Sequence, residues 1–317
     1  MTLYLREADV LQLLTMKDAI AAVEEATRLQ GLGEAINRPR QRLRSGRSVL
    51  QMMPASIGGM EVAGWKAYGG GRTGGQMRVF LFSTETGEFK AILEGNRLGQ
   101  MRTGAASGVA TKYLARANAT SVGMYGSGNQ ARTQLEAVCQ VRPIKSVKVY
   151  SRTPENREKF AKEMSDLLKV EVTPAEQPEA VCKGSDIVIT ITNSRDPVLK
   201  GEWLEPGTHI NAAGGNAIVR SEIDTEAVRR AEIITADDVE QAKMESGDLM
   251  QAVERGILNW EQVEELSKVV CGRMKGRVND EQITLFESHG LALWDVAAGE
   301  AVYRLAKEKG IGIQLPI

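Results

Sequence analysis

Histidine and cysteine are scarce in this chain of 317 residues, which contains two histidines and three cysteines. Neither His209 nor His289 shows a metal-ligand spacing, so we expect no metal and in particular no zinc site. The cysteines at 139, 182 and 271 are odd in number, far apart and outside any C-x-x-C motif. We therefore expect reduced, mostly buried thiols in a cytoplasmic protein.

Long apolar runs and an excess of one charge are also missing. No run of 18 apolar residues occurs, and residues 1–12 lack a basic segment followed by an apolar one, so we expect no membrane partner and no secretory leader. The net charge of −1 gives no sign of a nucleic-acid partner. A length of 317 residues exceeds the roughly 250–300 at which single cores stop growing, which predicts two domains.

A glycine turn at 126–131 is the most informative feature that is present. The apolar run 122–125 leads directly into Gly-Ser-Gly-Asn-Gln-Ala, and 132–138 has the pattern of a helix. Strand, G-x-G-x-x-A turn and helix are the context of a dinucleotide fingerprint. Gly126 permits the tight turn, Gly128 lets the backbone approach a pyrophosphate, and Ala131 allows close helix packing. Such turns also occur without a ligand, but this context predicts a nicotinamide or flavin dinucleotide.

The region from 121 to about 286 alternates strands and helices. Strands are expected at 121–125, 146–150, 170–173, 186–192, 208–211, 232–235 and 282–286, and helices at 155–168 and 222–230. This alternation predicts an α/β fold of the Rossmann type, with a doubly wound parallel sheet.

Residues 1–115 have a different pattern, typical of an α+β unit. A helix is expected at 15–32 with Thr15 as N-cap and Asp18 in its first turn. Strands are expected at 48–53, 62–68, 77–83 and 89–94, and helices at 103–114 and 291–309. We predict a substrate-binding and dimerisation domain made of 1–115 with 291–317, and a dinucleotide-binding Rossmann domain at 116–290.

The end of the second Rossmann strand bears on the choice of nucleotide. NAD-binding domains usually carry an acidic residue there for the ribose hydroxyls, but this strand ends in Ser151, Arg152 and Thr153. A guanidinium between two hydroxyls suits a 2′-phosphate. We favour NADP(H); alternatively, Arg152 stacks on adenine or caps a turn, and NAD(H) is used.

Three segments of the first domain are candidates for the reaction site. Arg38, Arg40 and Arg42 lie just before an expected strand, Lys66 stands alone in an apolar strand, and Arg102 begins a small-residue helix. Arginines bind a carboxylate bidentately, and a desolvated lysine can exchange protons near neutrality. Each also has a structural interpretation: a solvated basic turn, a lysine reaching the sheet edge, and a helix-terminus arginine.

Several motifs in order resemble the ornithine cyclodeaminase/mu-crystallin family over residues 4 to 312. They are Trp65-Lys66, residues 101–105, residues 126–132, Asn211-Ala-Ala-Gly-Gly215 and residues 284–292. The resemblance implies a homodimer of two-domain subunits and a small carboxylated amino or imino acid as substrate. It also implies an oxidoreductase of amino acid metabolism, a cyclodeaminase, or a non-catalytic ligand-binding dimer.

By position in that family, Arg40, Lys66 and Arg102 match the residues that bind the substrate carboxylate, and Lys66 also faces the reacting nitrogen. Gln51 and Asn216 replace a glutamate and an aspartate of the cyclodeaminase. A neutral Asn is a poor base for closing a proline ring. We therefore favour an NAD(P)-dependent amino acid dehydrogenase or imine reductase over a cyclodeaminase that recycles its own nucleotide, and both over a non-catalytic dimer.

The expected site residues fall into three groups. The catalytic residues are Lys66, Arg102 and Asn216. The substrate-binding residues are Arg40, Gln51, Lys66, Arg102 and His289. The cofactor-binding residues are Thr103, Gly126, Ser127, Gly128, Asn129, Gln130, Ala131, Ser151, Arg152, Thr153, Thr192, Asn193 and Ser288.

Overall fold

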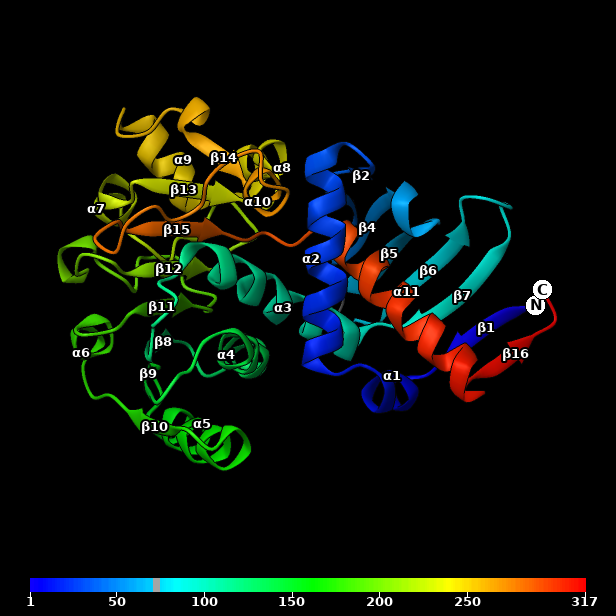
Figure 1. Ribbon diagram of the computed structural model, residues 1–317, viewed down its shortest axis with the longest axis horizontal. Helices are drawn as coiled ribbons and strands as arrows, with labels where there is room; N and C mark the ends of the chain where they lie inside the picture. Colours follow the sequence, from blue (N-terminus) through cyan, green and yellow to red (C-terminus); the bar gives the residue numbers. More distant parts are fainter. Residues whose placement is uncertain (71–74) are drawn as a thin grey trace. The chain divides into compact units, whose positions relative to one another are not determined.

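The computed structural model describes residues 1–70 and 75–317, which form two compact units (Figure 1). Unit 1 comprises Met1–Ala105 and Leu291–Ile317, and unit 2 comprises Ala106–Gly290. The first boundary therefore falls earlier than residue 115, where the sequence placed it. Helix α3 (Asn96–Leu114) runs through this boundary without a break, so no turn or change of composition marks it.

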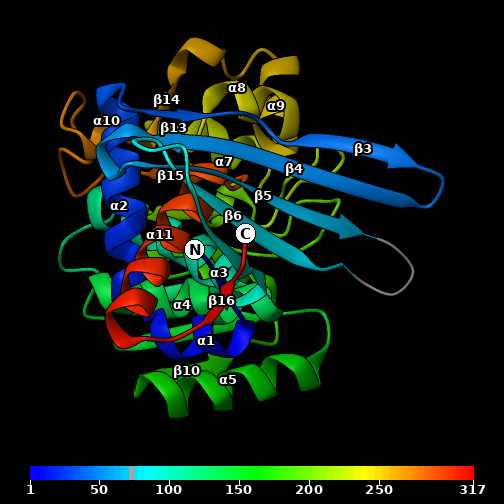
Figure 2. The ribbon, with the colours of Figure 1, turned by 90° about the vertical axis from the view of Figure 1, so that its right-hand side faces the viewer.

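Unit 1 is built on an eight-stranded mixed sheet, of which Figure 2 shows strands β3 to β6. Its order is β16-β1-β7-β6-β5-β4-β2, with β3 paired to β4. The strands are β1 (Thr2–Leu5), β2 (Ala35–Asn37), β3 (Gln41–Ser45), β4 (Ser48–Ile57), β5 (Val62–Gly70), β6 (Met77–Ser83), β7 (Phe89–Glu94) and β16 (Ile313–Leu315). The four expected strands are present, and the other four are short. Strands β1 and β16 pair with segments far away in the chain, whereas β2 and β3 both pair with β4, and β3 forms a hairpin with it.

Helices cover one face of this sheet. They are α1 (Glu7–Leu13), α2 (Met16–Leu32), α11 (Ala292–Lys309) and the first turns of α3, and η1 (Gly58–Met60) is a short 3₁₀ turn. Thr15 and Asp18 form the capping box that the sequence predicted for α2. Helix α11 packs against α2 and against β4, β5 and β6 (Figure 1). It ends at Gly310 with φ 64°, a left-handed conformation that suits glycine.

Unit 2 contains an eight-stranded sheet of order β10-β9-β8-β11-β12-β15-β13-β14, in which every pairing is parallel. The strands are β8 (Ser121–Tyr125), β9 (Ser146–Tyr150), β10 (Glu171–Pro174), β11 (Ile187–Thr190), β12 (His209–Ala212), β13 (Ile233–Ala236), β14 (Val263–Glu265) and β15 (Thr284–Glu287). The strand order reverses between β8 and β11, which is where ligands bind in doubly wound sheets. The predicted α/β fold is confirmed.

Two apolar cores lie on the two faces of this parallel sheet. Leu135 of α4 and Phe160 of α5 belong to one core, and Val228 of α7 and Leu249 of α9 belong to the other. The helices are α4 (Asn129–Val141), α5 (Pro154–Leu168), α6 (Pro178–Cys182), α7 (Thr225–Arg230), α8 (Val239–Glu245), α9 (Gly247–Glu254) and α10 (Leu266–Val270), with 3₁₀ turns η2 (Gly201–Trp203) and η3 (Trp260–Gln262). The sheet is buried on both sides, as its continuous apolar strands require.

Three helix starts differ from the sequence prediction by three residues or more. Helix α3 begins at Asn96 rather than at 103, α4 at Asn129 rather than at 132, and α7 at Thr225 rather than at 222. The side chain of Asp224 accepts a hydrogen bond from the Ala227 amide, so the N-cap lies inside the segment that was expected to be helical. Glu222 is thereby left outside the helix, in a buried loop.

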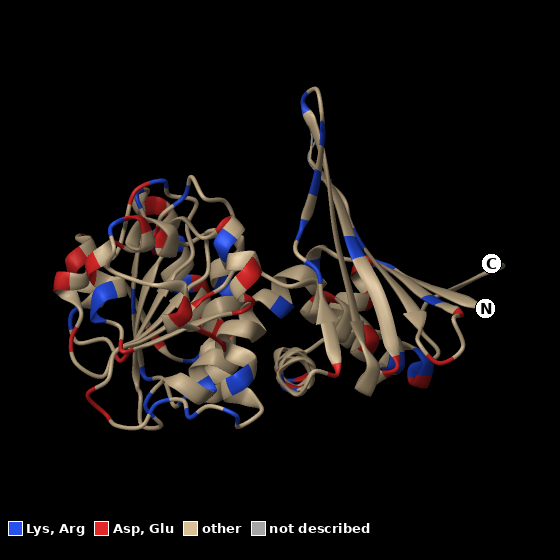
Figure 3. Cartoon of the chain, turned by 90° about the horizontal axis from the view of Figure 1, so that it is seen from above, with Lys and Arg blue, Asp and Glu red and all other residues tan. Residues whose placement is uncertain are grey.

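The three cysteines are free, and burial raises the pKa of Cys139 and of Cys182 to about 12. No helix within the described ranges is long and apolar enough to cross a bilayer. The described residues also contain no group of three or more acidic, histidine or cysteine side chains that could hold a metal. Acidic and basic residues occur together on both units (Figure 3). The cytoplasmic location stays a prediction.

Candidate active site

Lys66 lies in the middle of β5 and points to the helix-covered face of the unit 1 sheet. The alternation of the strand decides this, because Val62, Gly64 and Lys66 are buried while Trp65 between them faces the other side. Only 1% of the Lys66 surface is exposed. A lysine at such a position requires a partner, since an isolated ammonium is costly to bury.

That partner is Asp295, in the first turn of α11. Its Oδ2 lies 2.7 Å from Lys66 Nζ, and its Oδ1 accepts a hydrogen bond from Arg102 Nε of α3 at 3.0 Å. The Asp295 side chain is fully buried. The structure therefore brings Lys66 and Arg102 together through one carboxylate, and this carboxylate is not among the site residues predicted from the sequence. The available signal was a single acid in the otherwise apolar stretch 291–298.

The arginines before β3 differ in their surroundings. Arg38 is exposed and Arg42 is half-buried, whereas Arg40 is buried, with its Nε 3.3 Å from Sδ of Met53. Met53 pairs with Lys66 in the register of β4 and β5. The interpretation as a solvated turn therefore fits Arg38 but not Arg40, which joins Lys66, Arg102 and Asp295 in what we call the cation cluster.

Charge and burial together set the proton affinity of Lys66. Burial lowers its pKa most, Arg102 and Arg40 lower it further, and Asp295 raises it, with the result that the pKa is about 7. An amine with this pKa can donate and accept a proton near neutrality.

Two neutral side chains extend the cation cluster along the sheet. The Tyr68 hydroxyl donates to Gln51 Oε1 at 2.8 Å, and the Tyr68 ring centroid lies 5.5 Å from Lys66 Nζ. Burial raises the pKa of Tyr68, which keeps its hydroxyl protonated. Gln51 was a predicted site residue, whereas Tyr68 was not, because nothing in the sequence distinguishes it from other strand aromatics.

The cation cluster has a deficit of negative charge. It contains three basic side chains and the carboxylate of Asp295, and Arg102 is only 6% exposed. Within the described part of the chain, the buried Arg102 Nη1 has no hydrogen-bond partner. A buried guanidinium edge without an acceptor is a site for an anion, most naturally a carboxylate.

The glycine turn of unit 2 has the geometry that a dinucleotide requires. Gly126 has φ 111°, and a Cβ there would lie 2.3 Å from the Ile191 carbonyl oxygen. Gly128 is the N-cap of α4 and provides no side-chain cap, so the helix start presents backbone amides for a phosphate. Ala131 is fully buried against the sheet. Asn129 and Gln130 form the first turn of α4.

Ser127 and Ser151 lie side by side beyond the ends of β8 and β9, with their hydroxyl oxygens 2.9 Å apart. Arg152 and Thr153 follow and are exposed. No carboxylate stands at 151–153, as the sequence indicated. These residues fit the adenosine end of a dinucleotide.

Glu222 organises the loops after β11 and β12. This buried carboxylate accepts hydrogen bonds from Thr190 Oγ1 at 3.1 Å, from the Gly214 amide at 2.7 Å and from the Thr192 amide. Burial is the main cause that raises its pKa to about 7. Thr192 and Asn193 lie in the first loop, and Asn216 is half-buried in the second. The sequence analysis placed Glu222 in a helix and missed this role.

His289 is held between two acids at the end of β15. Its ring Nδ1 lies 3.4 Å from Asp237 Oδ1 and its Nε2 lies 3.6 Å from Glu287 Oε1. Burial lowers the pKa of His289, but the two carboxylates outweigh this and raise it to about 10. The histidine is therefore a cation near neutral pH. The adjacent Ser288 is buried, and its amide donates to the Ala212 carbonyl at 2.8 Å.

The predicted residues are thus divided between the units. Lys66, Arg102, Arg40, Gln51 and Thr103 belong to unit 1, and the remaining candidates belong to unit 2. The Thr103 hydroxyl donates to the Gly99 carbonyl at 2.7 Å within α3. The roles of Thr103, Asn216 and His289 stay predictions.

Comparison with known proteins gives a consistent result. Residues 1–310 match the model of the ornithine cyclodeaminase/mu-crystallin family. An alanine dehydrogenase of Archaeoglobus fulgidus is 39% identical over 321 residues, covering 99% of this chain and 98% of its own. The resemblance inferred from the motifs is confirmed.

Two solved structures are similar over their full length. Thermococcus litoralis Δ1-pyrroline-2-carboxylate reductase, in complex with NADH and L-proline, has a TM-score of 0.93 and 36% identity, covering 99% of this chain and 100% of its own. An archaeal alanine dehydrogenase dimer with bound NAD has a TM-score of 0.93 and 37% identity, covering 100% of this chain and 99% of its own.

Proposed function

The chain belongs to the ornithine cyclodeaminase/mu-crystallin family, and from this premise we propose that it transfers hydride between a nicotinamide dinucleotide and the α-carbon of a small α-imino or α-amino acid. The relatives confirm the predicted class, a nicotinamide-dependent amino acid dehydrogenase or imino acid reductase. The observation that carries the substrate proposal is the cation cluster, whose buried Arg102 Nη1 lacks an acceptor among residues 1–70 and 75–317.

The substrate carboxylate binds to Arg102 and Arg40. A guanidinium fork holds a carboxylate in one plane, which fixes the direction in which the adjacent α-carbon faces. The carboxylate also brings a second negative charge to a cluster in which one acid faces three bases. Holding the reacting carbon in a near-attack position contributes about 7–11 kcal/mol to lowering the barrier.

Lys66 exchanges the proton of the substrate nitrogen. In the reductive direction its ammonium donates to the imine, and in the oxidative direction its neutral amine accepts a proton from the amino group. A pKa of about 7 leaves both forms populated near neutrality. The nicotinamide, when bound, supplies or accepts the hydride.

The glycine turn at 126–131, which includes Ser127, holds the pyrophosphate, and residues 151–153 hold the adenosine end. The absence of a carboxylate after β9 supports NADP(H), with Arg152 paired to the 2′-phosphate. NAD(H) is the alternative, because the similar structures named above contain NADH and NAD.

A homodimer is supported by the face of the unit 1 sheet opposite α11. Trp65, Phe80, Phe82 and Phe89 form a ladder there, with ring centroids 4.6–5.3 Å apart for three neighbouring pairs. Aromatic side chains are enriched in subunit interfaces. A second copy of the chain would cover this ladder, and Trp65→Glu should convert a dimer to monomers in sedimentation velocity.

A reductive amination screen tests the function. Pyruvate and oxaloacetate with ammonia or methylamine, and the five-membered cyclic imine Δ1-pyrroline-2-carboxylate, are each offered with NADPH and with NADH while absorbance at 340 nm is followed. We expect stoichiometric loss of reduced nucleotide with at least one substrate. Formation of proline and ammonia from ornithine without a net change at 340 nm would show a cyclodeaminase instead, and nucleotide binding with neither reaction would indicate a binding protein.

A further inference from the structure

We propose that Asp295 is a positioning residue that orients Arg102 for the substrate carboxylate and keeps a proton on Lys66. This rests on the proposed function, which assigns the carboxylate to Arg102 and proton exchange to Lys66. Asp295 acts through these two side chains and needs no contact with the substrate.

The contacts of the carboxylate explain the orienting role. Asp295 Oδ1 accepts from Nε of Arg102, at 3.0 Å, while Oδ2 lies 2.7 Å from Lys66 Nζ. The contact with Asp295 occupies Nε of the guanidinium, and Nη1 has no acceptor in the part of the chain that the structure describes. Because both cations are tied to one rigid carboxylate, the distance between the carboxylate-binding edge and the proton donor is constrained.

The location of Asp295 argues for function rather than for packing. It is fully buried beside Leu293, Trp294 and Val296, which are also fully buried. An aliphatic side chain would fill this position in a helix that has to cover a sheet. A buried ion pair is weak evidence for stability, because desolvation offsets most of the attraction.

The charges around Lys66 explain the proton-holding role. Arg102 of α3 and Arg40 before β3 lower its pKa, as burial does, and the Tyr68 hydroxyl on the same strand is neutral. Asp295 of α11 raises the Lys66 pKa. Removing this negative charge would leave Lys66 facing only bases, and the ammonium would lose its proton at neutral pH.

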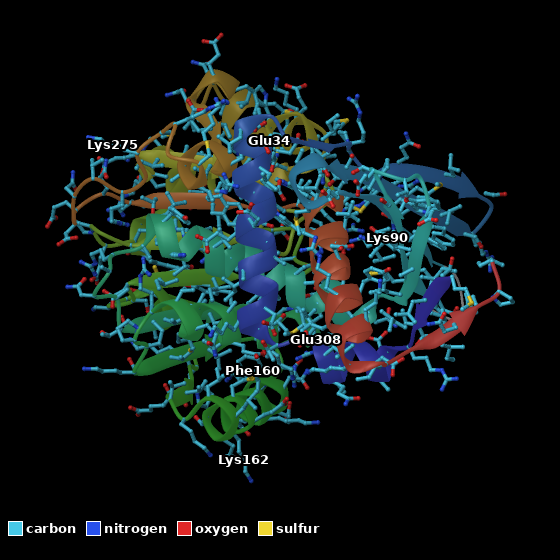
Figure 4. All side chains as sticks on the ribbon, turned by 45° about the vertical axis from the view of Figure 1, so that its right-hand side comes forward. Glu34, Lys90, Phe160, Lys162, Lys275 and Glu308 are labelled. Carbon is cyan, nitrogen blue, oxygen red and sulfur yellow. The ribbon has the colours of Figure 1, made fainter. Side chains whose placement is uncertain are left out.

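The test compares Asp295→Asn with Asp295→Glu and with a matched control. Lys90 of β7, labelled in Figure 4, makes an ion pair of 2.7 Å with buried Glu300 of the same helix α11. Glu300→Gln therefore removes an equivalent strand-to-helix carboxylate outside the cation cluster. The pH profile of kcat/KM is measured in the reductive direction with the substrate that the screen identifies.

For Asp295→Asn we expect kcat/KM at pH 7.5 to fall at least about tenfold. The pH profile should show a limb in which activity is lost as Lys66 loses its proton, and the midpoint of this limb should lie lower than in the wild type by about one pH unit or more. Asp295→Glu should return the limb toward its original position while KM stays raised, because the longer side chain displaces Arg102. Glu300→Gln should move neither quantity. An unmoved limb in Asp295→Asn, or an equal shift in Glu300→Gln, would overturn the proposal.

A second readout does not depend on turnover. The titration of Lys66 is followed by NMR of protein with ε-¹³C-lysine, and Lys66→Ala assigns the signal. Asp295→Asn should lower the pKa of that signal, and Glu300→Gln should not. If wild-type protein reduces no substrate but the signal shifts as expected, the proposed function fails and the proton-holding role of Asp295 stands. If the signal does not shift, that role is wrong whatever the activity.

Discussion

Unit 1 buries three basic side chains around the carboxylate of Asp295, whereas hydroxyls and backbone amides surround the buried carboxylates of Asp248 and Glu222 in unit 2. In unit 1, the buried Arg102 Nη1 lacks an acceptor among the described residues. In unit 2, Asp248 Oδ1 alone accepts from Ser221 Oγ at 2.7 Å and from the amides of Glu222 and Ile223 at 2.7 and 3.1 Å.

This contrast separates two uses of buried charge. A polar group that is fully hydrogen-bonded within the chain holds loops in place, as Asp248 and Glu222 do. An excess of one sign with an unpartnered edge is costly in the free protein, and a ligand of opposite sign removes the cost. The cation cluster therefore indicates a binding site, and the carboxylates of Asp248 and Glu222 indicate a scaffold.

Lys66→Ala should give the largest effect. We expect kcat/KM to fall at least about 100-fold, equivalent to about 2.7 kcal/mol of transition-state stabilisation, because Lys66 is the residue to which we assign proton exchange with the substrate. Nucleotide affinity, measured by fluorescence titration, should stay within about twofold. Lys90→Ala is the matched control, since Lys90 is also paired with an acid of α11. Retention of more than a tenth of the activity in Lys66→Ala would remove its assigned role.

Asp248→Ala should destabilise the protein by about 3 kcal/mol in urea unfolding, since it leaves the buried amides of Glu222 and Ile223 without their acceptor. Asp248→Asn keeps an acceptor oxygen and should cost less than about 1 kcal/mol. Equal losses in the two variants would show that the negative charge, and not the acceptor, holds this loop. The activity per folded molecule should change little in Asp248→Asn.

Arg152→Ala tests whether an exposed guanidinium contacts the 2′-phosphate of NADP(H). Affinity for NADPH should fall by roughly 1.5–3 kcal/mol, the range for a hydrogen bond to a charged group, while affinity for NADH changes little. Lys159→Ala, an exposed cation of α5, should not discriminate between the two nucleotides. Equal losses with both nucleotides in Arg152→Ala would place the guanidinium on a part that they share, such as adenine.

Glu222 of unit 2 and Lys66 of unit 1 should contribute to the pH dependence of stability in opposite directions. Glu222 has a pKa raised from 4.5 to about 7, so the folded state holds a proton that the unfolded state has lost, and stability falls as the pH rises through this window. Lys66 has a pKa lowered from 10.5 to about 7, so stability rises with pH between these values. Each group contributes a slope of up to about 1.4 kcal/mol per pH unit.

Urea unfolding of Glu222→Gln and Lys66→Met measures the two slopes. Glu222→Gln should flatten the fall in the unfolding free energy below pH 7, and Lys66→Met should flatten the rise above it. Lys66→Met should also raise the unfolding free energy at pH 7 by about 1 kcal/mol, because it removes one cation from a cluster with an excess of them. A loss of stability in Lys66→Met would contradict the idea that the cluster is strained without its ligand.

Local patterns in the sequence were enough to predict much of this protein. The glycine turn at 126–131, the parallel sheet of unit 2 and the capping box of α2 depend on neighbouring residues, on strand alternation and on side chains three residues apart. Lys66 could be singled out for the same reason, because a lone lysine among apolar neighbours is visible in the strand itself. The short strands β1, β2 and β16 were not predicted, since they pair with segments that are not their neighbours in the chain. Strand β3 pairs with the adjacent β4, but it is polar and mostly exposed, so no apolar pattern marks it.

Only the tertiary structure decided how charges from distant segments meet. Asp295 reaches Arg102 across 193 positions of the chain, and in sequence it is an ordinary acid in the first turn of a helix. Glu222 was expected to be helical. Because Asp224 is the N-cap of α7, Glu222 lies outside the helix, and the Glu222 carboxylate accepts hydrogen bonds from two loops. Whether a buried charge has hydrogen-bond partners and a counter-charge depends on all the groups packed around it. Those groups come from distant segments, so local periodicity in the sequence does not predict them.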